Sequence, residues 1–389
     1  MSAAPGEKTL NEINELIRLD TTSRDTNLPL IEKVIDKLHA VGVEHTLIHN
    51  AEGTKANLLA TIPAHDGTTT GGIVLSGHTD VVPVDGQEWS SEPFEPAVRE
   101  GKLYGRGTCD MKAFIGVILS RLTELTSARL KEPVHLAFSY DEEVGCVGAV
   151  GLVEKITELG LAPRGAVVGE PSSMRVIRGH KSMNVFKVDF HGVAAHSSLP
   201  GEGLNAISYA TRFARFVDEV SAELRQGERD EAFIEPTTTM NVNRIDGGIA
   251  VNTIPALCTV FFEYRSLASV DREALTARMR AEAERLRDEM RQVNPAGRVD
   301  FSIQAGAPGL DTAPEAEIVE LAARWGGETA QDKVTYGTEA GLFAGAGIPT
   351  VVCGPGDIAQ AHAPDEFIEL SQITACEQFI DAMIADLSQ

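Results

Sequence analysis

The chain has 389 residues, with 34 Lys and Arg against 57 Asp and Glu, so its formal charge is −23. This length is enough for a large core and predicts two domains, while the acidic charge argues against a nucleic-acid or anionic-membrane partner. No apolar run approaches the roughly 20 residues of a membrane-spanning helix. The five cysteines show no Cys-x-x-Cys spacing and the first residues lack the apolar segment of a secretory signal, so we expect a reducing cytoplasm.

The first third of the chain alternates helical and strand patterns. Apolar residues at helical spacing predict helices over 8–20 and 29–41. Short apolar runs at 73–75, 134–138 and 165–169 predict strands that are buried on both faces. A sheet flanked by helices satisfies both patterns, so we expect an α/β fold with helices on both faces of the sheet.

The pattern changes after about residue 181. The segments that follow predict strand, helix, strand, strand, helix and strand, in that order, over 185–191, 204–224, 237–245, 251–267, 271–292 and 298–303. This βαββαβ order is typical of a ferredoxin-like α+β domain.

A return to the first domain is expected after a hinge rich in Gly and Ala at 305–309, with a helix near 314–325 and a strand at 349–353. The sequence therefore predicts an α/β domain made of 1–179 and 306–389, interrupted by an inserted domain of residues 180–305.

Acidic residues and histidines follow the predicted strands at several places. His78 and Asp80 come directly after the strand at 73–75, and Glu170 follows the apolar run at 165–169. Residues two apart in an extended backbone share a face, so Asp80 can orient the imidazole of His78. A hydrogen-bonded turn is the alternative explanation for this His–Asp pair.

Three further segments add acids and a second imidazole. Asp110 precedes a predicted helix at 114–119, the acids at 141–143 follow a strand, and His362 follows the strand at 349–353. Taken singly, a helix cap or a solvated loop accounts for such acids. Together, two imidazoles and at least three carboxylates at strand ends suit divalent zinc, and a carboxylate that bridges two ions would make a two-metal hydrolase.

These motifs make nearly the whole chain resemble the di-zinc amidohydrolase family of aminoacylases, carboxypeptidase G, succinyl-diaminopimelate desuccinylases and acetylornithine deacetylases. The segments 105–112, 336–343 and 354–366 are most similar to the acetylornithine deacetylase branch. That resemblance implies zinc-dependent hydrolysis of N2-acetyl-L-ornithine to L-ornithine and acetate, in arginine biosynthesis. Another N-acyl-L-amino-acid amidohydrolase, either an aminoacylase or a desuccinylase, is the alternative, and a non-catalytic binding protein of the same fold is a third.

The resemblance implies two zinc ions per subunit, and such ligands can also hold Co²⁺. Asp110 would bridge both ions. Glu143 and His362 would complete one site, and His78 and Glu170 the other.

The same resemblance implies roles for two further acids. Glu142 would be the general base and then the general acid, while Asp80 would orient His78. A cis peptide bond is expected between Asp110 and Met111.

The inserted domain would be a dimerisation (lid) domain, which makes the protein a homodimer. By resemblance, His196 donates to the oxyanion in the active site of the partner subunit, Asn252 adds a polar contact, and Arg265 pairs with the α-carboxylate of the substrate. Without the resemblance, His196 is explained as a surface-loop histidine and Arg265 as a solvated strand-end arginine.

Thr338 and Glu339 complete the expected substrate-binding residues, because they lie in the segment 336–343 that marks the deacetylase branch. We expect Glu339 to lie near the side-chain amine of the N-acyl amino acid.

Overall fold

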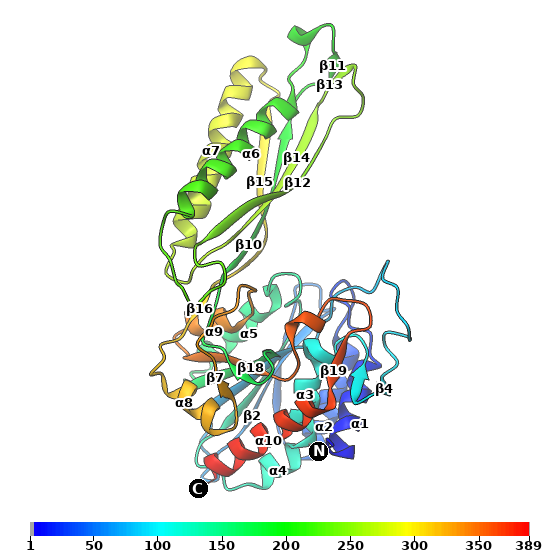
Figure 1. Ribbon diagram of the computed structural model, residues 1–389, viewed down its shortest axis with the longest axis vertical. Helices are drawn as coiled ribbons and strands as arrows, with labels where there is room; N and C mark the ends of the chain where they lie inside the picture. The colour runs from blue at the N-terminus through cyan, green and yellow to red at the C-terminus, as the bar shows by residue number, and fades with distance from the viewer. Residues whose placement is uncertain (1–3, 389) are drawn as a thin grey trace. The chain divides into compact units, whose positions relative to one another are not determined.

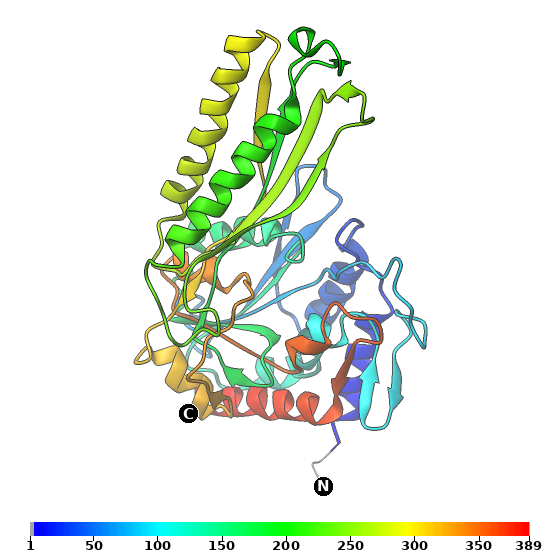
Figure 2. The same ribbon diagram turned by 45° about the horizontal axis from the view of Figure 1, so that its top comes forward.

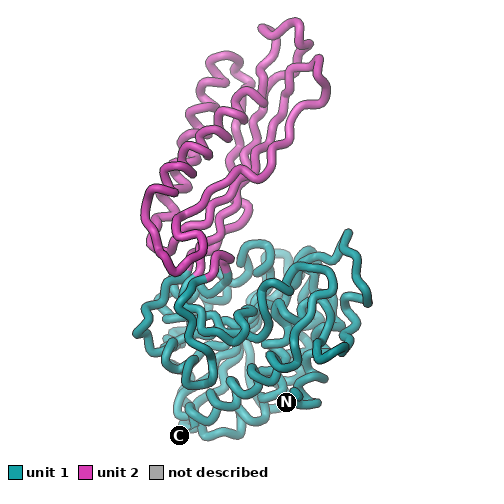
Figure 3. Tube along the Cα trace, in the orientation of Figure 1, with its two compact units in different colours: residues 1–179, 310–333, 338–389 teal, residues 180–309, 334–337 magenta. Residues whose placement is uncertain are grey.

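The structure, a computed structural model, describes residues 4–388 and divides into two compact units (Figure 3). Unit 1 contains the described residues up to 179 together with 310–333 and those from 338 onward. Unit 2 contains 180–309 and 334–337.

A six-stranded mixed sheet forms the centre of unit 1, in the order β1-β2-β6-β3-β7-β18. Its strands are β1 (His45–His49), β2 (Ala56–Ile62), β3 (Ile73–His78), β6 (Val134–Ser139), β7 (Gly165–Pro171) and β18 (Thr350–Gly354). The four strands β6, β3, β7 and β18 run parallel, whereas β2 pairs antiparallel with both β1 and β6. All residues of these parallel strands are buried, which agrees with their continuous apolar sequences.

Helices cover both faces of this sheet (Figure 1), which confirms the predicted fold class. One face and its helices share a single hydrophobic core, to which the helices α1 (Glu7–Ile17), α2 (Leu28–Ala40), α3 (Ala113–Ser120), α8 (Glu317–Arg324) and α10 (Leu370–Leu387) contribute. Two further helices pack on the other face, α5 (Val147–Glu158) and α9 (Ala340–Gly345).

Smaller elements complete unit 1. A three-stranded sheet has the order β19-β5-β4, formed by β4 (Ala97–Arg99), β5 (Lys102–Tyr104) and β19 (Phe367–Glu369). The remaining short elements are η1 (Thr108–Lys112), α4 (Leu122–Ser127), β8 (Arg175–Val176), β16 (Leu310–Asp311), β17 (Glu328–Thr329) and η3 (Ile358–Gln360); β9 (Gly179–His180) lies at the junction with unit 2.

Unit 2 has the predicted βαββαβ order, made of β10 (Met183–His191), α6 (Ala206–Leu224), β12 (Thr239–Gly247), β14 (Leu257–Arg265), α7 (Arg272–Val293) and β15 (Arg298–Ala307). Its antiparallel sheet has the order β12-β14-β10-β15, which is the ferredoxin-like arrangement. Both helices lie side by side on one face of this sheet (Figure 2). Each helix begins at a side-chain cap, supplied by Asn205 for α6 and by Asp271 for α7.

Two segments differ in detail from the predicted elements. The expected strand at 251–267 is divided into β13 (Thr253–Ile254) and β14, because Pro255 has no N–H to donate to a sheet. The short strand β13 pairs instead with β11 (Ala195–His196), near the one-turn helix η2 (Pro200–Glu202). Strand β15 continues to Ala307, into the segment that resembled a hinge.

All five cysteines are buried and unpaired. Within residues 4–388, the helices lack the combination of length and apolar character that crossing a lipid bilayer requires.

Candidate metal centre

The predicted metal ligands gather at one edge of the unit 1 sheet. His78 is the last residue of β3, Glu170 lies at the end of β7, and Glu143 follows β6 after a short turn. His362 lies in the loop after β18. Because β3, β6, β7 and β18 are parallel, their carboxyl ends meet at the same edge, where ligand sites form in open α/β sheets.

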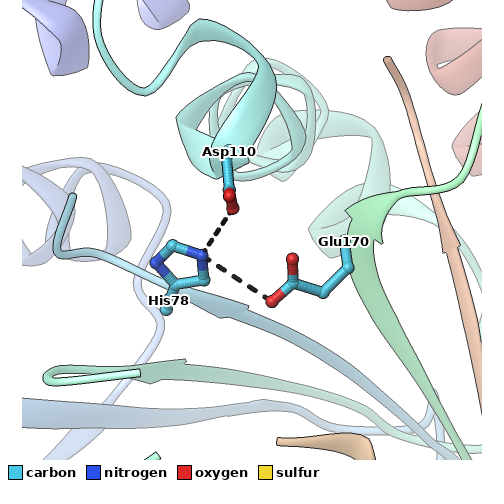
Figure 4. Close-up of side chains that lie close together, drawn as sticks. All are labelled: His78, Asp110 and Glu170. Carbon is cyan, nitrogen blue, oxygen red and sulfur yellow. Dashed lines mark hydrogen bonds and ion pairs between the residues drawn. The ribbon is translucent and has the colours of Figure 1, made fainter. Parts of the chain in front are cut away.

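His78, Asp110 and Glu170 form the first candidate metal-binding group, whose donor atoms lie within 4.8 Å of one another (Figure 4). Nε2 of His78 lies 2.9 Å from Oδ1 of Asp110 and 3.7 Å from Oε1 of Glu170. All three residues are buried. Oε1 of Glu170 is buried and has no hydrogen-bond partner among the described residues, so it is an acceptor that a cation would satisfy.

Asp110, Glu143 and His362 form the second group. Nε2 of His362 lies 2.9 Å from Oε2 of Glu143 and 3.2 Å from Oδ2 of Asp110. Asp110 therefore belongs to both groups, and it presents Oδ1 to the first and Oδ2 to the second.

The electrostatics of these groups favour added positive charge. Burial, reinforced by the charge of Asp110, raises the pKa of Glu170 and of Glu143. The hydrogen bonds that His362 donates to the carboxylates of Asp110 and Glu143 raise the pKa of this imidazole to about 10. Burial opposes ionisation of Asp110, but hydrogen bonds from His362 and His78 outweigh it and lower the pKa of this carboxyl.

Divalent metal ions fit this arrangement. Imidazole nitrogens and carboxylate oxygens are ligands that zinc accepts, and the two groups each offer three of them around a shared carboxylate. A cation would also relieve the repulsion between the acids and satisfy the unpartnered oxygen of Glu170. The residues present thus match a two-ion site in donor type, burial and charge.

Asp80 links His78 to the turn that carries the two neighbouring glutamates. Nδ1 of His78 lies 2.9 Å from the backbone carbonyl oxygen of Asp80 and 3.6 Å from its Oδ1. The carboxylate accepts backbone N–H bonds from Glu142 at 3.1 Å and from Glu143 at 3.3 Å, and a hydroxyl bond from Ser23 at 2.7 Å. One buried residue therefore contacts the imidazole through its backbone carbonyl and holds the glutamate turn through its carboxylate.

Glu142 has a different environment from Glu143. Its side chain is not part of either candidate metal group, and Oε1 accepts a hydrogen bond from Sγ of Cys146 at 3.2 Å. Burial raises the pKa of this carboxyl, and the charges of Glu143 and Asp110 act in the same direction while that of His78 opposes them. A carboxyl with a raised pKa beside a metal site is suited to accepting and releasing a proton.

The backbone around Asp110 is irregular. Gly107 has φ 83°, a left-handed conformation that glycine adopts without steric cost, and Asp110 and Met111 have non-helical dihedral angles inside η1. The peptide bond between Asp110 and Met111 is cis, as the resemblance implied.

Thr338 and Glu339 lie in unit 1 but are buried, with exposed fractions of 1 % and 0 %. Oγ1 of Thr338 accepts from the backbone N–H of Ala340, and the carboxylate of Glu339 accepts from Ser76 at 2.7 Å and from Ser139 at 2.5 Å. One oxygen of Glu339 is thus bound by a serine of β3 and the other by Ser139, the last residue of β6, which lies opposite His78 in the sheet. The expected contact of Glu339 with a substrate amine stays a prediction.

The other three predicted residues lie in unit 2. His196 is exposed on β11, with Nδ1 2.7 Å from Oγ of Ser198. Asn252 is exposed in the turn before β13, and its backbone carbonyl accepts from Ser197. Arg265 ends β14 and is half-buried, with Nη2 3.2 Å from Oε2 of Glu263.

A set of supporting residues was not assigned a role from the sequence. The carboxylate of Glu366 accepts four hydrogen bonds from the segment 106–110, one of them from Arg106. Both residues lie inside the segments that carried the resemblance. A glutamate four residues after His362 and an arginine between two glycines are signals in the sequence, but only the fold shows that they meet.

Comparison with known proteins gives one consistent result. Residues 74–386 match the model of peptidase family M20/M25/M40. The acetylornithine deacetylase of Myxococcus xanthus is 33% identical over 376 residues, which are 96% of this chain and 96% of the relative.

Two solved structures share the fold at lower identity. An M20 family metallo-carboxypeptidase from Sulfolobus solfataricus is 17% identical with a TM-score of 0.76, over 98% of this chain and 100% of that one. A dinuclear metal-binding peptidase of the M20 family from Bacillus subtilis is 17% identical with a TM-score of 0.64, over 97% of each chain.

Proposed function

The chain belongs to peptidase family M20/M25/M40 and is a metallohydrolase that acts on an amide bond, and from this premise we propose that it hydrolyses N2-acetyl-L-ornithine to L-ornithine and acetate. The observation that carries the proposal is the pair of ligand groups around Asp110, with the carboxyl of Glu142 buried next to them. The substrate follows from the named relative, which matches over nearly the whole of both chains. This reaction would belong to arginine biosynthesis.

We assign two zinc ions to the site. One would be held by His78, Asp110 and Glu170, and the other by Asp110, Glu143 and His362. When bound, such ions lower the pKa of a water molecule and draw electron density from the carbonyl oxygen of the amide. The same ligands accept Co²⁺, so cobalt is expected to replace zinc in the purified protein.

Glu142 would move the proton in the reaction. One of its carboxylate oxygens accepts a proton from the attacking water, and the same group then delivers that proton to the departing amine nitrogen. The hydrogen bond from the Glu142 backbone N–H to Asp80 holds the residue in place, and Asp80 would also keep His78 in the orientation a ligand needs.

Unit 2 would supply the dimer contact. Ile249 and Val251 are almost fully exposed in the loop between β12 and β13, and β12 is an edge strand of the unit 2 sheet. Large exposed apolar side chains beside an open strand edge are typical of protein–protein interfaces. In a homodimer formed there, His196 would donate to the oxyanion in the active site of the partner subunit, a role that its exposed position supports.

Two residues of unit 2 would recognise the substrate. Arg265 would bind the α-carboxylate through its guanidinium, and Asn252 would add a polar contact. Thr338 and Glu339 would support the strand ends instead of contacting substrate, because both side chains are buried. The free buried cysteines are consistent with a reducing compartment, and we place the protein in the cytoplasm.

The decisive experiment is a side-by-side measurement of kcat/KM for acetylornithine, succinyl-diaminopimelate and acetylmethionine, with the protein loaded with Zn²⁺ or Co²⁺. We expect acetylornithine to be the best substrate and EDTA to abolish its turnover. Preference for either of the other compounds would identify an aminoacylase or a desuccinylase instead. No hydrolysis of any acylated amino acid would overturn the catalytic assignment and favour a binding protein.

A further inference from the structure

The carboxylate of Glu366 is enclosed by the loop that carries Asp110. Oε1 accepts the backbone N–H groups of Cys109 at 2.8 Å and of Asp110 at 3.1 Å. Oε2 accepts the backbone N–H of Gly107 at 3.1 Å and Nη1 of Arg106 at 2.7 Å. Successive N–H groups that converge on one anion form a concave site whose shape the anion maintains. Glu366 therefore determines the path of the backbone at Asp110.

Arg106 extends this contact to the loop of His362. Its guanidinium is buried, and Nη2 donates to Oε1 of Gln87 at 2.7 Å. Nε2 of the same glutamine donates to the backbone carbonyl of His362 at 2.9 Å. The ring of Trp89 packs against the guanidinium, with 5.0 Å between the carbon Cζ and the ring centroid. A continuous set of hydrogen bonds thus joins the backbone at Asp110 to the backbone at His362, and we call Arg106, Glu366 and Gln87 the loop clamp.

The two metal-binding groups differ in what holds their ligands. In the first group, His78 and Glu170 come from β3 and β7, which are neighbours in the central sheet. In the second group, Glu143 and His362 come from loops, and Asp110, which both groups share, lies in η1 outside the strands. His362 itself is exposed and has φ 62°. Packing of its side chain against neighbouring residues therefore does little to hold it in position. The second group depends on connections between loops, whereas the sheet supports the first.

We propose that the loop clamp is a positioning device for the second metal ion, the one that Asp110, Glu143 and His362 would hold. It keeps Asp110 and His362 at the separation that one ion requires. Its loss lowers affinity at this group much more than at the group that contains His78 and Glu170. The inference rests on the proposed two-ion function.

Glu366→Gln tests the proposal with little change in shape. The amide presents an NH₂ donor where the carboxylate had an acceptor oxygen, so N–H donors on one side of the side chain lose their partner. Zn²⁺ alone serves as the probe, measured by titration calorimetry and by metal analysis after dialysis against fixed free zinc. Wild type is expected to bind two ions per chain. The variant is expected to bind one with unchanged affinity and the other at least about tenfold more weakly, since outer-shell changes commonly cost 10–100-fold in metal affinity.

Glu377→Gln is the matched control. Glu377 is also buried in unit 1 and accepts from the backbone N–H of Gly6 and from Arg121, but it lies outside the site. This variant is expected to lose thermal stability and to keep both ions. Gln87→Ala provides a second test if Glu366→Gln does not fold, because Gln87 is only half-buried and connects directly to His362. It is expected to weaken the same single ion.

Co²⁺ absorption spectra add a readout that a general loss of stability would not change. In Glu366→Gln, the spectrum of the first equivalent of Co²⁺ should match wild type and that of the second should change. Two wild-type affinities in the variant, equal weakening of both ions, or the same weakening in Glu377→Gln would each overturn the loop-clamp proposal. A wild-type protein that binds fewer than two ions would instead overturn the proposed two-ion function.

Discussion

Asp80 accepts the backbone N–H of Glu142 on Oδ1 at 3.1 Å, so a residue that follows β3 holds the turn that follows β6. The backbone carbonyl of the same aspartate lies 2.9 Å from Nδ1 of His78. The residue proposed to move the proton and a residue proposed to bind metal are thus positioned by one buried residue, the first through its carboxylate and the second through its backbone carbonyl. Their relative position depends on this hydrogen bonding and on the parallel pairing of the two strands.

Replacement of Asp80 should therefore affect metal binding and catalysis together. Asp80→Ala is expected to weaken zinc binding about 10–100-fold and to lower kcat, because the 142–143 turn, which carries one proposed ligand and the proposed general base, loses its acceptor. Calorimetric titration and kcat at saturating Zn²⁺ measure the two effects. Asp85→Ala is the control, since Asp85 is exposed and pairs only with arginine on the surface. Wild-type zinc affinity in Asp80→Ala would contradict the orienting role.

Glu142→Ala should separate proton transfer from metal binding. The side chain lies outside both candidate metal groups, so we expect the zinc content to remain unchanged while kcat falls by about 10²–10⁴. Metal analysis and steady-state kinetics on the same preparation provide the comparison, with the exposed Glu158→Ala as a control for the loss of a negative charge. Full activity would remove the assignment, and loss of zinc would make Glu142 a ligand.

Substitution at Glu339 should affect stability more than substrate preference. The carboxyl group is fully buried between Ser76 and Ser139, and each of its oxygens already accepts a hydrogen bond from one of these serines. Glu339→Gln should leave the ratio of kcat/KM for acetylornithine and acetylmethionine unchanged within about twofold. Glu339→Ala should lower stability by about 1–3 kcal/mol, because the two buried hydroxyls lose their acceptor. A selective loss of acetylornithine turnover in Glu339→Gln would restore the direct contact that the sequence suggested.

The buried His180 predicts a stability change in mild acid. Burial lowers the pKa of this imidazole from 6.5 to about 4, so the unfolded chain binds the proton more readily than the folded one. The stabilising effect of the neutral form is fully present above about pH 6.5 and is lost as the pH falls toward 4, up to about 3 kcal/mol. Thermal unfolding from pH 7 to 4 should show a smaller loss in His180→Gln than in wild type. Equal slopes for the two proteins would contradict the prediction.

The periodicity of the sequence predicted many of the major elements, but the helices α5 and α10 were not among them. Apolar runs such as 73–75 form buried parallel strands. The order of elements in unit 2 could be predicted because the spacing of apolar residues there distinguishes the helices from the strands. The antiparallel strands β1 and β2 were not predicted; β1 is only partly buried and has no apolar run. The prediction of one strand at 251–267 passed over Pro255, where the structure divides this segment into β13 and β14.

The chemistry of the site was present in the sequence as residue types after strands, and those types together suited a divalent metal site, whereas the resemblance to a known family implied the activity and the role of each residue. Which of two adjacent glutamates joins a ligand group, and that Glu339 points into the protein, depend on side-chain direction and burial that spacing does not specify. The contact of Glu366 with residues 107–110 joins segments more than 250 positions apart. Local sequence sets backbone preference and burial, but only the folded chain can decide which distant loops share a hydrogen bond.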